Sequence, residues 1–309
     1  MPGVERPPIG DELFGQAMSS NAFVTLDPWY EATGFRTTQL THANQRAAGA
    51  RPAAEFLLNT RLIRGDAETS ISVEDYFGDG SIGMLSMRGR EPRGAIDRVA
   101  LPDGPQVWLA LGDVVARRRS TRMYTGDPVA LAAIATMIRG VVGTTADATV
   151  QLLAGGEATL HYRATPSGGG LYPNDLCVAA LAVDGLDRGV YKVAPVEEAL
   201  LQVGDAGDLA SLLRAFAAPE DLISLSRAAA VFLIVGHPSR STRKYGGRGV
   251  RLMLLEAGAM AEHLNLFAVA LGLGAVDCAA YYDDEIDAAL GLDGVGQMVL
   301  HSVIVGEPA

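Results

Sequence analysis

The sequence predicts an α+β fold in which a buried helix lies against a mixed β-sheet. Residues 228–235 form an apolar run without alternation, which is typical of a strand covered on both faces. Residues 248–273 carry the longest helical pattern and are apolar on nearly every side, as in a central or subunit-interface helix. The chain has 309 residues, of which 49% are hydrophobic, so it can build a sizeable core as one large domain or two ordinary ones.

Shorter patterns predict the other elements in chain order. Residues 109–122 are expected to form a helix that runs into a cluster of arginines, and Pro128 is expected to open a helix over 129–138. Apolar runs predict strands at 150–154, 161–163, 176–183 and 189–193, and an amphipathic pattern predicts a helix at 208–216. After the long helix, the sequence predicts an acidic helix at 283–290 and a closing strand at 297–305.

Residues 1–105 differ from the rest, because aromatic residues are scattered there among Pro, Gly and Arg without long apolar periodicity. We interpret them as an N-terminal extension that ends at the turn signal Pro102–Pro105, and residues 106–309 as the main domain. Within the extension, residues 55–62 fit a short helix, and residues 70–77 fit either a strand or the start of a helix.

Composition excludes several classes of partner. A net charge of −11 opposes nonspecific binding to nucleic acid and to anionic membranes. The N-terminus has no apolar signal segment, and no later run is long and uninterrupted enough to span a bilayer, so we expect a cytoplasmic protein. The two cysteines, Cys177 and Cys278, lie among apolar residues and are expected to be buried free thiols.

A glycine-rich loop, residues 163–175, precedes the strand predicted at 176–183. Its three consecutive glycines, Gly168–Gly170, carry no Cβ, so their amides can approach a flat ligand closely. Pro166 and Pro173 fix the backbone on either side. The alternative is an ordinary Gly-Pro turn between two strands.

An arginine cluster places four arginines within residues 117–122 of an otherwise acidic chain. It is either an anion site or a solvated helix face. Arg118, Ser120 and Arg122 would offer a phosphate two guanidinium groups and a hydroxyl. These alternate residues share a face only in an extended segment, because on a helix Ser120 would not align with the two arginines.

Four segments in this order resemble the nitroreductase superfamily, and specifically its SagB-type branch of flavin-dependent dehydrogenases. The segments are residues 118–122, 166–173, 189–195 and 244–274, and the resemblance spans about residues 110–306. It implies a nitroreductase-like fold, with a mainly antiparallel sheet flanked by helices around a long buried helix. It also implies a domain-intertwined homodimer that builds each flavin site from two chains.

The resemblance implies FMN as the cofactor and assigns roles to its contacts. Arg118, Ser120 and Arg122 would hold the phosphate and ribityl chain. The loop residues expected along the isoalloxazine ring are Pro166, Ser167, Gly168, Gly169 and Gly170, and those expected at its pyrimidine side are Gly272, Leu273 and Gly274. The alternative for the last three is a helix C-cap followed by a turn.

This chain departs from the family pattern at one point. Many nitroreductases carry a further basic residue near the C-terminus, whereas this chain has no Lys or Arg after Arg251. Arg248 or Arg251 is therefore expected to supply that charge.

Lys244 and Tyr245 match the catalytic signature of the resembling dehydrogenases. A tyrosine near a lysine is expected to have a lowered pKa and to take a proton from the substrate. The alternative is an exposed polar pair in a loop. The histidines His237, His263 and His301 lack metal-ligand spacing, so structural roles and no metal site are expected.

The implied function is an FMN-dependent dehydrogenase that oxidises thiazolines or oxazolines of a precursor peptide to azoles, with O₂ as the electron acceptor. A cyclodehydratase would make the azoline, and residues 1–105 would wrap the dimer, cover the substrate channel or bind a leader peptide. One alternative is an NAD(P)H-dependent nitro or quinone reductase, which has no use for Lys244 and Tyr245. Another is a non-catalytic scaffold of a peptide-modifying complex.

Overall fold

The computed structural model describes residues 56–62, 71–74, 95–151 and 155–309. The chain divides into two compact units, residues 1–61 and 62–309. In the first unit, residues 56–59 form one helical turn within the predicted helix 55–62. In the second, residues 71–74 are helical, and the rest of the predicted element 70–77 lies outside the described residues. All that follows concerns the second unit.

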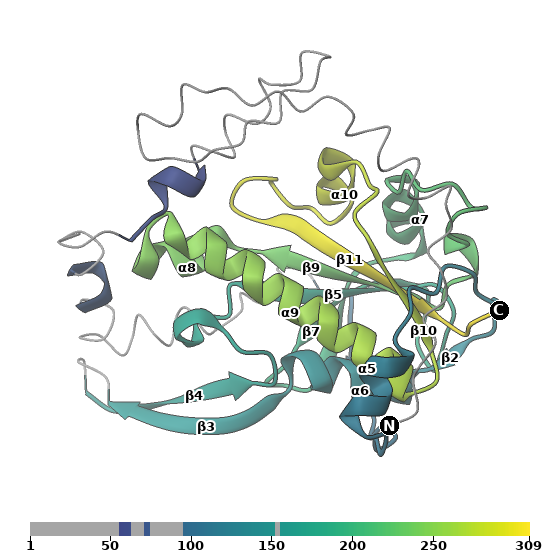
Figure 1. Cartoon of the computed structure of the whole chain (residues 1–309), viewed down its shortest axis with the longest axis horizontal. Helices are drawn as coiled ribbons and strands as arrows, with labels where there is room; N and C mark the ends of the chain where they lie inside the picture. The colour runs from purple at the N-terminus through teal and green to yellow at the C-terminus, as the bar shows by residue number, and fades with distance from the viewer. Residues whose placement is uncertain (1–55, 63–70, 75–94, 152–154) are drawn as a thin grey trace, which may run out of the picture. The chain divides into compact units, whose positions relative to one another are not determined.

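The core of this unit is a seven-stranded sheet with the order β1-β8-β7-β5-β9-β11-β10 (Figure 1). Every neighbouring pair of strands in it is antiparallel. The strands are β1 Asp97–Ala100, β5 Asn174–Ala180, β7 Gly189–Ala194, β8 Ala199–Gly204, β9 Ala230–Gly236, β10 Gly274–Cys278 and β11 Met298–Gly306. The expected mainly antiparallel α+β fold is confirmed.

Helices cover both faces of the sheet. On one face, α6 (Leu131–Val142) and α9 (Arg248–Ala270) form an apolar core with inward residues of the strands. On the other, α7 (Ala206–Arg214) and α10 (Asp283–Ala289) form a second core. All seven residues of β9 are buried between these layers, which explains why its sequence does not alternate.

Helix α9 is the long helix predicted from residues 248–273. Its 23 residues correspond to about 34 Å at 1.5 Å per residue. One face packs on the sheet, whereas Leu254 and Leu255 on another face are 48% and 71% exposed. Helix α9 is long and apolar enough to cross a membrane, but the buried core helices of soluble proteins can have the same length and composition. Met260 and Leu264 of α9 lie in the core.

The predicted helix 109–122 is wrong at its C-terminal end. Helix α5 spans only Leu111–Arg117, and the chain then runs extended. Ser120 forms a β-bridge with Ala275, and the Thr121 amide donates to the Ala275 carbonyl at 2.8 Å. This tertiary pairing with β10 competes successfully with the local helical pattern.

The second predicted helix is shifted. Val129–Ala130 form strand β2, which pairs in parallel with β6 (Val183–Asp184), and α6 follows. Gly140 lies inside α6, where any side chain would overlap the ring of Phe267. Gly143 is the C-cap.

The remaining elements lie outside the seven-stranded sheet. Strands β3 (Thr144–Gln151) and β4 (Glu157–Arg163) form a hairpin, and residues 152–154 of a predicted strand lie outside the described residues. The other short elements are η2 Gly168–Gly170, η3 Leu225–Arg227 and α8 Pro238–Tyr245. Sequence patterns did not predict β8 or β1, and β1 adds an edge strand N-terminal to the boundary expected at Pro102–Pro105.

Candidate active site

The glycine-rich loop and the Lys244–Tyr245 pair lie in contact; we call residues 166–170 with Lys244 and Tyr245 the loop cluster. Gly169 and Gly170 have φ values of 70° and 65°, which favour glycine. A Cβ at Gly169 would overlap the phenol oxygen of Tyr245 and lie 2.9 Å from Lys244 Nζ. Two motifs separated by about 75 residues in the sequence therefore meet at one point, and glycine permits the close approach.

Tyr172 holds the end of the loop in a strained conformation. Its φ of 45° is unusual for a residue with a side chain. Its phenol oxygen accepts from the Arg163 amide at 2.8 Å, and its own amide donates to Ser167 Oγ at 2.8 Å. The Arg163 guanidinium also lies 4.6 Å from the Tyr172 ring centroid. These contacts bind the loop to the end of β4.

A buried ionic cluster around Asp175 joins α8 to the sheet. Arg240 donates to both carboxylate oxygens at 2.6 and 3.1 Å, and Lys192 Nζ and His237 Nε2 lie 2.7 and 2.8 Å from Oδ2. Burial alone would raise the pKa of Asp175, but the charge of Arg240 and the bonds from His237 and Arg240 hold it well below its usual value. Because Asp175 follows the loop on β5 and Arg240 precedes Lys244 on α8, this cluster fixes the loop and the pair relative to one another.

Sequence reasoning did not single out Asp175, Arg240 or Tyr172. A usable signal exists for Asp175, since it is a carboxylate at the start of a buried apolar strand and buried charges need partners. The partners themselves lie on other elements, and no local pattern identifies them.

Lys244 is 1% exposed, so the alternative of an exposed loop pair is wrong for it. Burial lowers the pKa of Lys244 and raises the pKa of Tyr245. The expected lowering of the phenol pKa by the lysine is thus not met, because Lys244 Nζ lies 5.1 Å from the ring centroid and desolvation dominates.

Residues 118–122 and 272–274 form a second group, which we call the basic cluster. The β-bridge from Ser120 to Ala275 brings these segments together, and a Cβ at Gly274 would meet the Thr121 side chain. Residues 118–122 are not helical and pair with Ala275 through Ser120, so they meet the condition under which Arg118, Ser120 and Arg122 are expected to share a face. Gly272 has a φ of 80° and follows the C-cap of α9, as the helix-end alternative predicted.

The loop cluster and the basic cluster lie at opposite ends of α9. Lys244 and Tyr245 precede the helix and Gly272 follows it, so one chain separates the clusters by roughly the 34 Å length of α9. Arg248 and Arg251 begin α9 and therefore lie at the end of the loop cluster. The expectation that Arg248 or Arg251 supplies the phosphate charge therefore stays a prediction, and it requires that a second chain bring the arginine to the basic cluster.

The two clusters fit the two ends of FMN. The guanidinium groups of Arg118 and Arg122 and the hydroxyl of Ser120 suit a phosphate, and all three side chains reach the surface. Glycines present main-chain amides without a Cβ of their own, which suits a flat ring, and the Cβ position at Gly272 is open, with no neighbouring atom within 4 Å. A bound FMN would contact Arg118, Ser120 and Arg122 at its phosphate, and it would reach the Pro166–Gly170 loop only if a second chain supplied that loop.

The histidines and cysteines have structural partners or surroundings. His263 Nδ1 lies 2.8 Å from the Gly140 carbonyl, and His301 Nε2 lies 2.8 Å from Asp277 Oδ1. Cys177 and Cys278 are free and buried, as predicted. Within residues 56–62, 71–74, 95–151 and 155–309, no three His, Cys, Asp or Glu side chains are grouped to hold a metal ion.

Comparison with known proteins decides the family. The family model described as "Nitroreductase family" matches residues 115–306, which include both clusters. The chain belongs to the nitroreductase family. It is therefore a nitroreductase-family oxidoreductase, and members of this family commonly bind FMN.

The relatives of this nitroreductase-family chain include a Methanocaldococcus jannaschii protein provisionally described as a nitroreductase. The two are 31% identical over 193 residues, which cover 61% of this chain and 86% of the relative. A solved Ralstonia eutropha protein with the same provisional description has a TM-score of 0.53 at 22% identity, over 72% of this chain and 97% of its own.

Two further structures share the fold. An Anabaena variabilis protein, also provisionally a nitroreductase, has a TM-score of 0.54 at 23% identity, over 69% of this chain but only 42% of its own length. A chain of the E. coli microcin synthetase McbBCD complex, solved with truncated pro-MccB17 bound, has a TM-score of 0.51 at 18% identity. That match covers 96% of this chain and 92% of the other.

We expect Arg122→Ala to release FMN. Loss of a charge-assisted phosphate contact typically costs about 1.5–3 kcal/mol, or roughly 10- to 100-fold in affinity. Flavin retained after ultrafiltration of the variant measures the effect, and Arg119→Ala is the control, because the Arg119 side chain donates to main-chain carbonyls of Ala116 and Arg118. Unchanged retention in Arg122→Ala would remove Arg122 from the phosphate site.

Proposed function

We propose that this chain is an FMN-dependent dehydrogenase that oxidises thiazolines or oxazolines in a precursor peptide to thiazoles or oxazoles. The observation that carries the proposal is the contact of Lys244 and Tyr245 with Gly169. It brings an amine and a phenol to the loop along which the flavin ring is expected. An enzyme that only passes electrons from NAD(P)H to a nitro group has no need of this pair.

In this proposal Lys244 is the general base. Burial lowers its pKa, so a larger share of its amine is neutral and can accept the Cα proton of an azoline ring. Tyr245, whose pKa burial raises, stays protonated and donates a hydrogen bond that orients the ring. Bound FMN supplies the acceptor for the hydride that leaves the neighbouring carbon.

The overall reaction balances with molecular oxygen as the second substrate. The azoline loses one proton and one hydride, two electrons in all, and becomes an aromatic azole. Oxygen takes up both electrons and two protons and leaves as hydrogen peroxide. The protein's part is to orient the ring, to hold and pass on the proton through Lys244 and to exclude water from the buried side of the pair.

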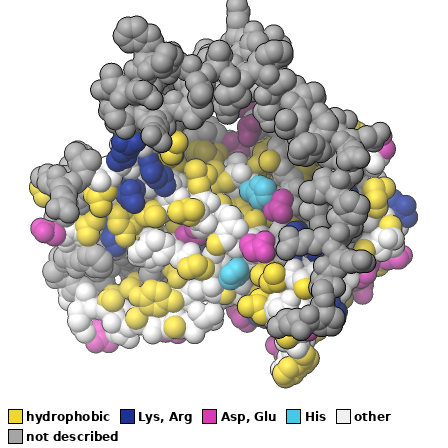
Figure 2. Space-filling model, in the orientation of Figure 1, with side chains coloured by type: hydrophobic (Ala, Val, Ile, Leu, Met, Phe, Trp, Pro, Cys, Tyr) yellow, Lys and Arg dark blue, Asp and Glu magenta, His cyan; other side chains and the backbone are white. Residues whose placement is uncertain are grey.

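The separation of the two clusters supports a homodimer. One FMN cannot bridge about 34 Å, but a second chain with its α9 antiparallel would bring its loop cluster to the first chain's basic cluster. Figure 2 shows hydrophobic side chains gathered over the face that carries α9. Among the exposed hydrophobic residues, Leu255 of α9 is 71% and Leu111 of α5 is 69% exposed. An apolar cavity of about 1020 Å³ opens between α5, α6 and α9. We propose that the second copy covers this face.

The likeness to the microcin synthetase chain, solved in a complex with a bound pro-peptide, supports a peptide substrate and a partner enzyme, which we propose to be a cyclodehydratase. That match extends over 96% of this chain, beyond the range of the family model. The N-terminal extension would then serve the peptide or the dimer rather than the flavin.

A nitro or quinone reductase is the second candidate, because the Methanocaldococcus jannaschii relative is provisionally described as a nitroreductase. Anaerobic stopped-flow mixing separates the two. The proposal predicts that an azoline peptide bleaches the bound flavin within seconds, whereas NADPH bleaches it more slowly by at least about tenfold. Fast bleaching by NADPH and none by the peptide would favour the reductase.

A further inference from the structure

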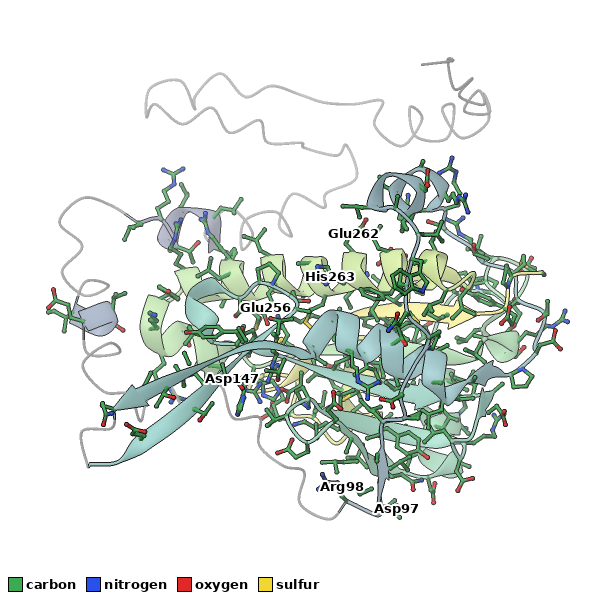
Figure 3. The ribbon with its side chains drawn as sticks, turned by 90° about the horizontal axis from the view of Figure 1, so that it is seen from below. Asp97, Arg98, Asp147, Glu256, Glu262 and His263 are labelled. Carbon is green, nitrogen blue, oxygen red and sulfur yellow. The ribbon has the colours of Figure 1, made fainter. Side chains whose placement is uncertain are left out.

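Glu256 is a buried acidic residue that neither the mechanism nor the basic cluster uses. It lies on the side of α9 that faces the glycine-rich loop, one helical turn after Leu252, which contacts Gly168. Its side chain is 4% exposed. Ser167 of the loop and Asn174 of β5 lie within hydrogen-bonding reach of its carboxyl group. Figure 3 shows Glu256 and Glu262 on different sides of α9, and Glu262 is exposed.

The polar atoms around Glu256 lack one proton donor. The Asn174 amide nitrogen donates to the Met253 carbonyl at 3.0 Å, which fixes the orientation of that side chain. Asn174 Oδ1 and Glu256 Oε2 are then both buried acceptors without a hydrogen-bond donor among the described residues. A proton on the Glu256 carboxyl supplies a donor in this group, whereas a carboxylate adds another unpaired acceptor.

Burial favours the neutral form of Glu256 over the effect of its polar and charged neighbours. Burial raises the pKa of Glu256 to about 7, against lowering by Ser167, the Arg163 charge and Asn174. Desolvation lowers the pKa of Arg163 itself, and the charge of Arg163 also interacts with Asp175 and Tyr172. Nearby, Asp175 and Arg240 are paired with each other, and Lys192 and His237 also lie against Asp175. Lys244 lies against Gly169 of the same loop.

We propose that Glu256 is a positioning residue that, in its protonated form, holds the Pro166–Gly170 loop in the geometry that receives FMN. The inference rests on the proposed function only in taking this loop as the flavin site. When the carboxyl loses its proton, a buried charge arises beside Ser167 and the loop shifts to admit water. Binding of FMN is therefore coupled to pH through a residue that does not itself touch the substrate.

The test compares Glu256→Gln, Glu256→Leu and the control Glu262→Gln in the full-length protein. A glutamine amide mimics the protonated acid, because it both accepts and donates, whereas leucine does neither. Fluorescence titration with FMN is expected to give near wild-type affinity for Glu256→Gln and roughly tenfold weaker binding for Glu256→Leu at about pH 6. As pH rises through about 7, the wild type and Glu262→Gln should lose several-fold in affinity, while Glu256→Gln stays constant.

Two readouts distinguish this inference from the proposed function. If the wild type does not bind FMN, the proposed function fails. If it binds FMN but Glu256→Leu binds equally well, or Glu256→Gln keeps the wild-type pH dependence, the positioning role is overturned. Infrared spectroscopy of the flavin-free protein reports the proton directly: a carboxylic C=O band below about pH 7 that Glu256→Gln lacks supports the inference, and its absence from the wild type contradicts it.

Discussion

Lys244→Ala is expected to lower the rate of azoline oxidation by at least about 10²-fold, because removal of a positioned general base typically costs 10²–10⁴-fold. The variant should remain yellow and dimeric, since Lys244 lies in the loop cluster and not at the phosphate contacts of the basic cluster. Turnover of a synthetic azoline peptide, followed by mass spectrometry and normalised to bound flavin, measures the effect. Tyr245→Phe should bind flavin equally and also lose oxidation.

The matched control is Arg243→Ala, the preceding residue of α8, whose side chain is exposed. It should retain wild-type turnover. Full activity in both Lys244→Ala and Tyr245→Phe would remove the pair from the mechanism. Loss of flavin in Lys244→Ala would instead assign the lysine a structural role.

Mixed dimers are expected to regain activity that neither parent has. Arg122→Ala breaks the basic cluster and Lys244→Ala breaks the loop cluster, and in one chain these clusters lie at opposite ends of α9. If each site takes one cluster from each chain, a dimer of the two variants contains one doubly damaged site and one intact site. Equal co-expression should then restore about a quarter of wild-type activity, since about half of the dimers are mixed.

Co-expression of Lys244→Ala with Tyr245→Phe serves as the control. Both substitutions fall in the loop cluster, so every site of a mixed dimer carries one of the two substitutions. That combination should stay inactive. If Arg122→Ala with Lys244→Ala also stays inactive in purified mixed dimers, each site is built from one chain, and the antiparallel arrangement of α9 is wrong.

Much of the fold follows from local pattern. The buried strand β9, the long helix α9 and the closing strand β11 were predicted nearly to their ends, because each is long and its apolar pattern matches its burial. The failures arise where tertiary pairing overrides a local preference. Residues 118–122 carry a helical pattern yet pair with β10, and Val129–Ala130 pair with β6 ahead of the helix that Pro128 was expected to open.

The candidate site was predictable in its motifs but not in its geometry. The glycines of the loop and the Lys244–Tyr245 pair are visible in sequence, and their contact is not, because it depends on the Asp175–Arg240 ion pair between β5 and α8. Glu256 is similarly hidden within an apolar helix. Burial determines whether the pKa of Lys244 and the pKa of Tyr245 are raised or lowered, and the spacing of residues in the sequence does not reveal burial.

The most direct test of the proposed function is mass spectrometry of an azoline-bearing peptide after aerobic incubation with the FMN-loaded protein. The proposal predicts the loss of two hydrogens, about 2 Da per ring, with hydrogen peroxide formed in equal amount and neither product formed by Lys244→Ala. An unchanged peptide mass, with flavin bound and NADPH bleaching it rapidly, would contradict the dehydrogenase assignment.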